Sequence, residues 1–149
     1  MGKTDHAFFR KCNERRDCFM TDEERKSLVS IRLQNAKDTL NEVPVHIENG
    51  FWNTATNRMY YACYYAVAAL LLKNGISVKT HSGVRQALGK EFVVTGLVSK
   101  EQARFFSILF DNRQTGDYDD FIMMTEEKVK ELYPQAVGFV KALESLIVK

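Results

Sequence analysis

The feature that most constrains the fold is an uncharged stretch in the middle of the chain. Residues 59–72, MYYACYYAVAALLL, carry no charge, and Arg58 and Lys73 flank them. Their apolar side chains fall on every side of a helical turn, and a helix that is apolar all round is a buried one. These fourteen residues rise only about 21 Å in a helix, which is short of the roughly 30 Å hydrocarbon core of a membrane. The stretch therefore predicts a central core helix within residues 53–74 and not a membrane span.

Four tyrosines limit how completely this helix can be buried. Each carries a hydroxyl group, and a buried hydroxyl needs a hydrogen-bond partner. They are Tyr60, Tyr61, Tyr64 and Tyr65. The alanines at 62, 66 and 69 leave room for a neighbouring backbone to come close. We therefore expect several helices to pack on this one, with one face left for a polar cleft or a second subunit.

The composition is that of one soluble globular domain. The chain has 149 residues, enough for a single sizeable core, and 45% of them are hydrophobic and 27% charged. Its 21 basic and 19 acidic residues leave a net charge of only +2, so no global field attracts nucleic acid. An anionic ligand would need a local basic patch.

The cysteines and histidines predict neither disulfides nor a metal site. The 3 cysteines make an odd number without CxxC spacing, and the 3 histidines, at 6, 46 and 81, are widely scattered. The first residues lack the apolar region of a secretory signal. We therefore expect a reducing, cytoplasmic location and no metal or other cofactor.

Helix capping predicts where the folded domain begins. Residues 1–20 show no pattern and are expected to form a mobile arm, which leaves residues 21–149 as the domain. Thr21 and Glu24 form a capping box that begins a first helix of about twenty residues, and Pro44 is expected to end it. The apolar stripe of this helix is expected to consist of Leu28, Ile31, Asn35, Ala36, Leu40 and Val43.

Three further helices follow the central one. A short, weak helix is expected within residues 77–94, another begins at Ser99 with a second capping box, and the last begins at Thr125. Pro134 is expected to kink the last helix. Since no alternating strand pattern occurs, the sequence predicts an all-α, up-and-down bundle of four main helices plus a short fifth helix.

Four segments in a fixed order resemble a known family. They are NRMYYACYYAVAALLLKNG, KTHSGVRQAL, FDNRQTGDYDD and, in the last helix, AVGFVKAL. Their order is similar to that in the HEPN superfamily, specifically its small single-domain members of the UPF0332 type. The resemblance implies a helical bundle that forms a homodimer. It also implies one of several activities: a metal-independent endoribonuclease, the toxin of a toxin–antitoxin pair, a partner of a minimal nucleotidyltransferase, or an inactive RNA- or nucleotide-binding module.

The family's nuclease motif is an Arg followed four to six residues later by a His, both in a cleft at the dimer interface. Arg113 matches the first half of the motif, but Asp117 and Tyr118 stand where the His would come. Proton transfer works best with a pKa near neutrality, and ordinary values are about 6.5 for His, about 10 for Tyr and about 3.9 for Asp. Losing a positioned acid or base costs about 10²–10⁴ in rate, whereas RNA binding could survive the loss.

Other residues leave the assignment of the site open. His81 could be the missing base, brought in from a neighbouring loop, or it could cap or pack a helix. Arg113 could hold a phosphate with its planar fork of donors, or it could only satisfy the end of its helix or pair with Asp117 or Asp119. Asn57 and Arg58 match the family's polar helix start and could shape the cleft, and Tyr61 could stack on a base or serve core and interface. The candidate catalytic residues are thus Arg113, Asp117, Tyr118 and His81, and the candidate nucleotide-binding residues are Arg113, Asn57, Arg58 and Tyr61.

Two classes of function are compatible with these residues. The first is an RNA- or nucleotide-binding HEPN protein, with catalysis left open; the second is a non-catalytic helical module for dimerisation and interaction. Charge alone does not decide, because basic and acidic side chains are interspersed near Arg113. The basic ones are Lys79, Arg85, Lys90, Lys100 and Arg104, and the acidic ones are Asp111, Asp117, Asp119 and Asp120.

Overall fold

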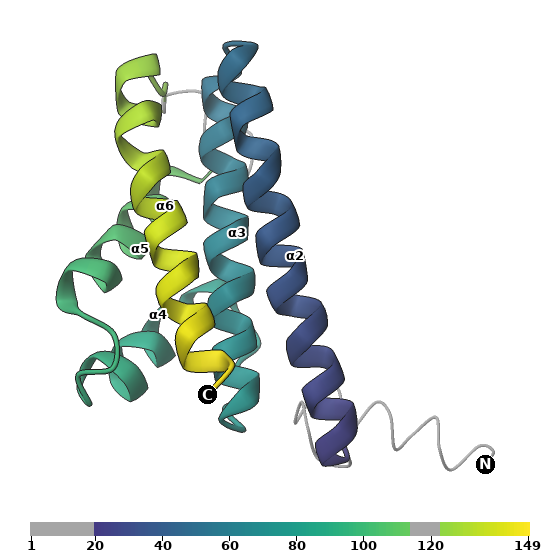
Figure 1. Ribbon diagram of the computed structural model, residues 1–149. Helices are drawn as coiled ribbons and strands as arrows, with labels where there is room; N and C mark the ends of the chain where they lie inside the picture. The colour runs from purple at the N-terminus through teal and green to yellow at the C-terminus, as the bar shows by residue number, and fades with distance from the viewer. Residues whose placement is uncertain (1–19, 114–122) are drawn as a thin grey trace.

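The computed structural model describes residues 20–113 and 123–149, and Figure 1 shows their arrangement. The elements are α2 (Asp22–Glu48), α3 (Trp52–Lys73), α4 (His81–Leu88), the π-helical turn η1 (Gly89–Val93), α5 (Lys100–Asn112) and α6 (Glu126–Ile147). Within these two ranges there is no strand. The predicted all-α bundle of four main helices and a short fifth is confirmed, whereas residues 1–19 lie outside the described ranges, so the arm and the domain bounds stay predictions.

Helix α3 is the centre of the bundle. It packs against α2, α4, α5 and α6, and Figure 1 shows it between α2 and α6. Its alanines at 55, 62, 66 and 69 are fully buried, which lets the neighbouring helices approach closely. The core helix predicted from the uncharged stretch is therefore present. No helix among the described residues is long and apolar enough to span a membrane.

Both ends of α6 are tied to α3. At the start of the two helices, the Met124 backbone N–H donates to Asn53 Oδ1 over 2.9 Å. At their ends, Lys73 Nζ donates to the carbonyl oxygens of Leu146 (3.0 Å) and Lys149 (3.1 Å). The two helices therefore run in the same direction, with α2 and α5 antiparallel to them, as in an up-and-down bundle (Figure 1).

The prediction that Pro44 ends the first helix is wrong. Helix α2 continues through Pro44 to Glu48, and Asn49 is its C-cap. Proline removes one backbone hydrogen bond. Burial continues on both sides of it, however, since Val43 is fully buried and Ile47, one turn later, packs against the core. The packing of this extra turn outweighs the lost hydrogen bond.

The predicted apolar stripe of α2 is also partly wrong. Ile31 and Asn35 are exposed, Ile31 to 55%, whereas Leu28 is half-buried and packs against the core; all three line a groove. Successive residues of a helix point about 100° apart, so two neighbouring stripes of aliphatic residues cannot both face α3. The buried stripe consists of Val29, Leu33, Ala36, Thr39, Leu40 and Val43.

Thr21 and Ser99 are both confirmed as N-caps, and of the two Ser99 alone has the complete capping box that was predicted for each. Thr21 Oγ1 accepts from the Glu24 backbone N–H (3.1 Å), and Ser99 forms a complete capping box with Gln102. At the end of α3, Gly75 has φ +71°, a conformation that suits glycine. Local sequence therefore determines these helix ends.

Candidate functional site

The candidate site forms around Tyr60 and His81. Tyr60 lies on α3 and is fully buried, and its hydroxyl oxygen is 2.7 Å from Nδ1 of His81, the first residue of α4. Burial raises the pKa of the Tyr60 hydroxyl, which therefore stays protonated. The His81 ring stacks on that of Tyr64 with centroids 4.3 Å apart. A side chain of α4 is thus held in place by two tyrosines of α3.

The start of α4 does not depend on His81 for its cap. Thr80 is the N-cap, and its Oγ1 accepts from the Gly83 backbone N–H over 2.8 Å. A Cβ atom at Gly83 would come within 2.9 Å of that oxygen, so glycine leaves the cap undisturbed. Of the two structural roles foreseen for His81, capping is excluded, and packing is observed.

Arg113 lies at the other side of the same cluster. It is the C-cap of α5, and its Nη1 donates to the Phe110 carbonyl oxygen over 2.7 Å. Its guanidinium carbon is 3.8 Å from the centroid of the Phe110 ring and 5.5 Å from that of Tyr60. This bond is the helix-terminal role foreseen for Arg113, but it takes only one of five guanidinium N–H donors.

Arg113 and His81 influence each other electrostatically. Burial and, next, the positive charge of Arg113 lower the pKa of His81 below its ordinary value. The imidazole is therefore neutral at pH 7. A neutral imidazole can accept a proton, and a guanidinium beside it can hold an anion.

Tyr60 and Arg85 join the site although the sequence did not single them out for it. The Arg85 guanidinium carbon lies 4.2 Å from the Phe110 centroid, and its Nη1 is 3.5 Å from Asp111 Oδ1. The helical spacing of Phe106, Phe110 and Arg113 was a signal that these side chains share one side of α5. No local pattern links Arg85 to them.

Two of the three other predicted binding residues share the exposed face of α3. Tyr61 meets the His81 ring edge to face, with centroids 6.0 Å apart. Asn57 lies one turn earlier, and its Oδ1 is buried without a hydrogen-bond partner among the described residues. Arg58 turns instead to α2, where its Nε is 2.9 Å from Glu42 Oε2. The structure thus groups Arg113, His81 and Tyr61 and sets Arg58 apart, while Asp117 and Tyr118 lie outside the described residues.

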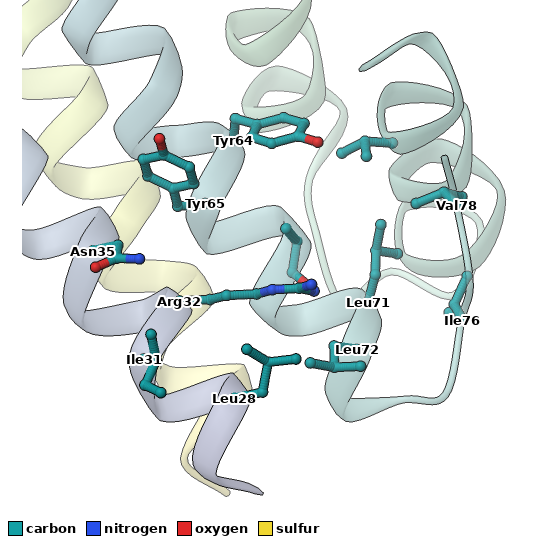
Figure 2. A pocket seen from close by; sticks show the side chains of 12 residues that line it. Leu28, Ile31, Arg32, Asn35, Tyr64, Tyr65, Leu71, Leu72, Ile76 and Val78 are labelled. Carbon is teal, nitrogen blue, oxygen red and sulfur yellow. The ribbon is translucent and has the colours of Figure 1, made fainter. Parts of the chain in front are cut away.

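A groove of about 320 Å³ adjoins the cluster. Figure 2 shows Arg32 of α2 reaching across it, with Nη1 3.4 Å from the Ala68 carbonyl oxygen of α3. Tyr64 lines the groove and also stacks on His81, so the two features are contiguous. The other labelled lining residues are Leu28, Ile31, Asn35, Tyr65, Leu71, Leu72, Ile76 and Val78.

No metal-binding group occurs in residues 20–113 and 123–149: nowhere there do three His, Cys, Asp or Glu side chains gather closely enough. The thiol of Cys63 is buried in the core, and this burial raises its pKa. The chemistry available in the described site is therefore that of arginine, imidazole and phenol.

Comparison with known proteins places the chain in a family. A model of the HEPN domain matches residues 29–146, so the chain belongs to the HEPN family, and the resemblance seen in the sequence is confirmed. A "UPF0332 protein" of Thermotoga maritima is 40% identical over 83% of this chain and 94% of its own length.

Two relatives of Methanocaldococcus jannaschii carry a functional name. "Putative toxin MJ0142" is 29% identical over 78% of this chain and 79% of its own length. "Putative toxin MJ0605" is 30% identical over 84% of this chain and 92% of its own length. The chain is thus similar both to a UPF0332 protein and to two proteins named "Putative toxin".

Proposed function

We propose that this HEPN-family chain binds RNA at the Arg113–His81 cluster and cleaves it without a metal ion, as a toxin-like component. The observation that carries the proposal is the meeting of Arg113 and a neutral His81 on Tyr60, from two separate helices. The Arg-to-His spacing of the family is missing from the sequence. His81 supplies the imidazole from another place in the chain.

The cluster offers each group that metal-free cleavage requires. In the tautomer whose Nδ1–H donates to the Tyr60 oxygen, His81 has a lone pair on Nε2, and the mechanism uses this tautomer to take the proton from a 2′-hydroxyl. The 2′-oxygen attacks the adjacent phosphorus, the bond to the 5′-oxygen breaks, and Nε2–H returns the proton to that oxygen. Arg113 stabilises the additional negative charge on the phosphate during the attack. The products are a 2′,3′-cyclic phosphate and a 5′-hydroxyl.

The test measures RNA affinity, cleavage and melting temperature on the same variants in buffer containing EDTA. Arg113→Ala is expected to abolish RNA binding and cleavage while the fold persists. His81→Gln is expected to keep RNA affinity but lower the cleavage rate by about 10²–10⁴. Lys141→Ala, which removes an exposed charge on α6, is the control and should change neither.

Two results would reject the proposal. The first is an Arg113→Ala protein with a lower melting temperature but unchanged RNA affinity, which would leave Arg113 a structural role only. The second is cleavage that appears only when a divalent cation is added, which would reject the metal-independent mechanism.

The second candidate is a non-catalytic dimerisation and interaction module. It is supported by a half-buried stripe of α3, formed by Asn57, Tyr61, Tyr64 and Ala68, which the neighbouring helices cover only in part. We expect a homodimer, and a minimal nucleotidyltransferase encoded beside this chain as a further partner. Light scattering that finds only a monomer at micromolar concentrations would reject the homodimer.

A further inference from the structure

Two arginines share a single aromatic ring at the end of α5. The guanidinium carbons of Arg113 and Arg85 lie 3.8 Å and 4.2 Å from the centroid of Phe110. They can therefore be no farther apart than the sum of these two distances. Arg113 comes from the end of α5 and Arg85 from the middle of α4, so the pair exists only in the folded chain.

Like charges at this separation repel, and identifiable contacts hold them together. The electron-rich face of Phe110 attracts both cations. Arg113 also donates to the Phe110 carbonyl oxygen over 2.7 Å, and Arg85 is 3.5 Å from Asp111. The Asp111 side chain is 68% exposed, so solvent weakens this ion pair. Among the described residues, one screened carboxylate is thus set against two guanidiniums.

Within the described residues, the bonds to the Phe110 carbonyl and to Asp111 use one N–H group of each arginine. A guanidinium that lies over a ring engages it with its flat face, whereas its N–H donors point outward in the plane. Those in-plane donors match the oxygens of a phosphate. Phe110 is buried, so its ring is a fixed contact that the two guanidiniums share.

We infer that Arg85 and Arg113 form a two-phosphate subsite that holds successive phosphates of one RNA strand. The inference rests on the proposed function, in which Arg113 binds the phosphate that reacts. It adds Arg85 as a second phosphate-binding residue. It also specifies the ligand as an oligonucleotide and not a mononucleotide. The phosphate on Arg85 fixes the register of the strand relative to His81.

The experiment compares Arg85→Gln, Arg113→Ala and the control Lys141→Ala for binding of a 2′-O-methylated oligouridylate, which lacks the attacking hydroxyl. Arg85→Gln removes the charge and the guanidinium fork but keeps a polar side chain at this position. It is expected to weaken oligonucleotide binding about tenfold, the value of a charge-assisted contact, and to lower the log–log salt slope by about 0.7. Binding of uridine 3′-monophosphate, followed by NMR, is expected to equal that of the wild type.

Each contrary result has a distinct meaning. If Arg113→Ala weakens oligonucleotide binding but Arg85→Gln does not, the subsite is rejected and the proposed function stands. If Arg85→Gln weakens the monophosphate as much as the oligonucleotide, both arginines serve one phosphate, and the subsite is rejected. An equal loss in Lys141→Ala would show a general charge effect and reject it too. If Arg113→Ala binds like the wild type, the proposed function fails first and the subsite with it.

Discussion

Both sides of α3 are uncharged over residues 59–72, but they differ in side-chain type and in burial. On the side facing α2 and α6, small and aliphatic residues such as Ala62, Ala66 and Leu70 are at most 1% exposed. On the side facing the groove, Asn57, Tyr61 and Tyr64 are only half-buried. The packed side is close-fitting because alanines bring the helix backbones together, whereas the groove side keeps the half-buried rings of Tyr61 and Tyr64.

The difference shows that an uncharged helix can still carry polar groups, here the hydroxyls of its tyrosines. Tyrosine buries its ring and leaves its hydroxyl for a partner or for water. Tyr60 lies at the border of the two sides, and its ring stacks on Phe106 with centroids 5.7 Å apart while its hydroxyl reaches His81. The border residue therefore connects the stability of the core to the chemistry of the site.

The largest effect is expected on the packed side. Leu70→Ala should lower the free energy of unfolding by about 2–5 kcal/mol, because it leaves a cavity that the rigid surroundings cannot fill. The matched truncation Ile31→Ala, at the rim of the groove, should cost less than about 1 kcal/mol, since the side chain is 55% exposed. Urea denaturation measures both. Equal losses would mean that the groove side is packed as tightly as the core.

A smaller effect is expected at the border. Tyr60→Phe keeps the ring packing and removes the hydroxyl, so it should lower the free energy of unfolding by about 0.5–1.5 kcal/mol. The ¹⁵N chemical shifts of the His81 ring should also change, because Nδ1 loses its partner. Tyr61→Phe is the matched control on the groove side. If the His81 ¹⁵N shifts are the same in both variants, the hydrogen bond to Tyr60 does not determine the tautomer of the imidazole.

The smallest effect is expected from pH. Because the folded-state pKa of His81 lies below its ordinary value of about 6.5, the unfolded chain binds more protons between the two values. The contribution of neutral His81 to the free energy of unfolding is therefore fully present above about pH 6.5, and it is lost as the pH drops to the folded-state pKa of His81. Arg113→Ala should raise that pKa part of the way, since burial, the larger cause, remains. An NMR titration of the His81 ring measures it, and an unchanged pKa would separate Arg113 from His81.

The elements set by local sequence were predictable. The uncharged run predicted α3, and the side chains of Thr21 and Ser99 predicted two helix starts, because each cap involves residues only three positions apart. Which side of α2 is buried was not predictable in this way. Two aliphatic stripes compete there, and only the position of α3 decides which is buried. Pro44 was misread for the same reason, since packing beyond it keeps the helix intact.

The candidate site was predictable only in part. Arg113 and His81 could be named from the resemblance and from their chemistry. The contact between Tyr60 and His81 joins residues 21 positions apart, and that between Arg85 and Asp111 joins residues 26 apart. Neither contact leaves a periodic signal, because each depends on how α4 lies against α3 and α5. The residues that position or extend a site are thus harder to find than those that give it its chemistry.

The ties at both ends of α6 also restrict how the chain can change in length. Helices α3 and α6 both have 22 residues and run side by side in the same direction. Inserting one residue into either helix would rotate the remainder of that helix by about 100° and advance it by about 1.5 Å. Asn53 and Lys73 could then no longer both keep their contacts. We therefore expect insertions and deletions among homologues to avoid this pair of helices, whose lengths can change only together.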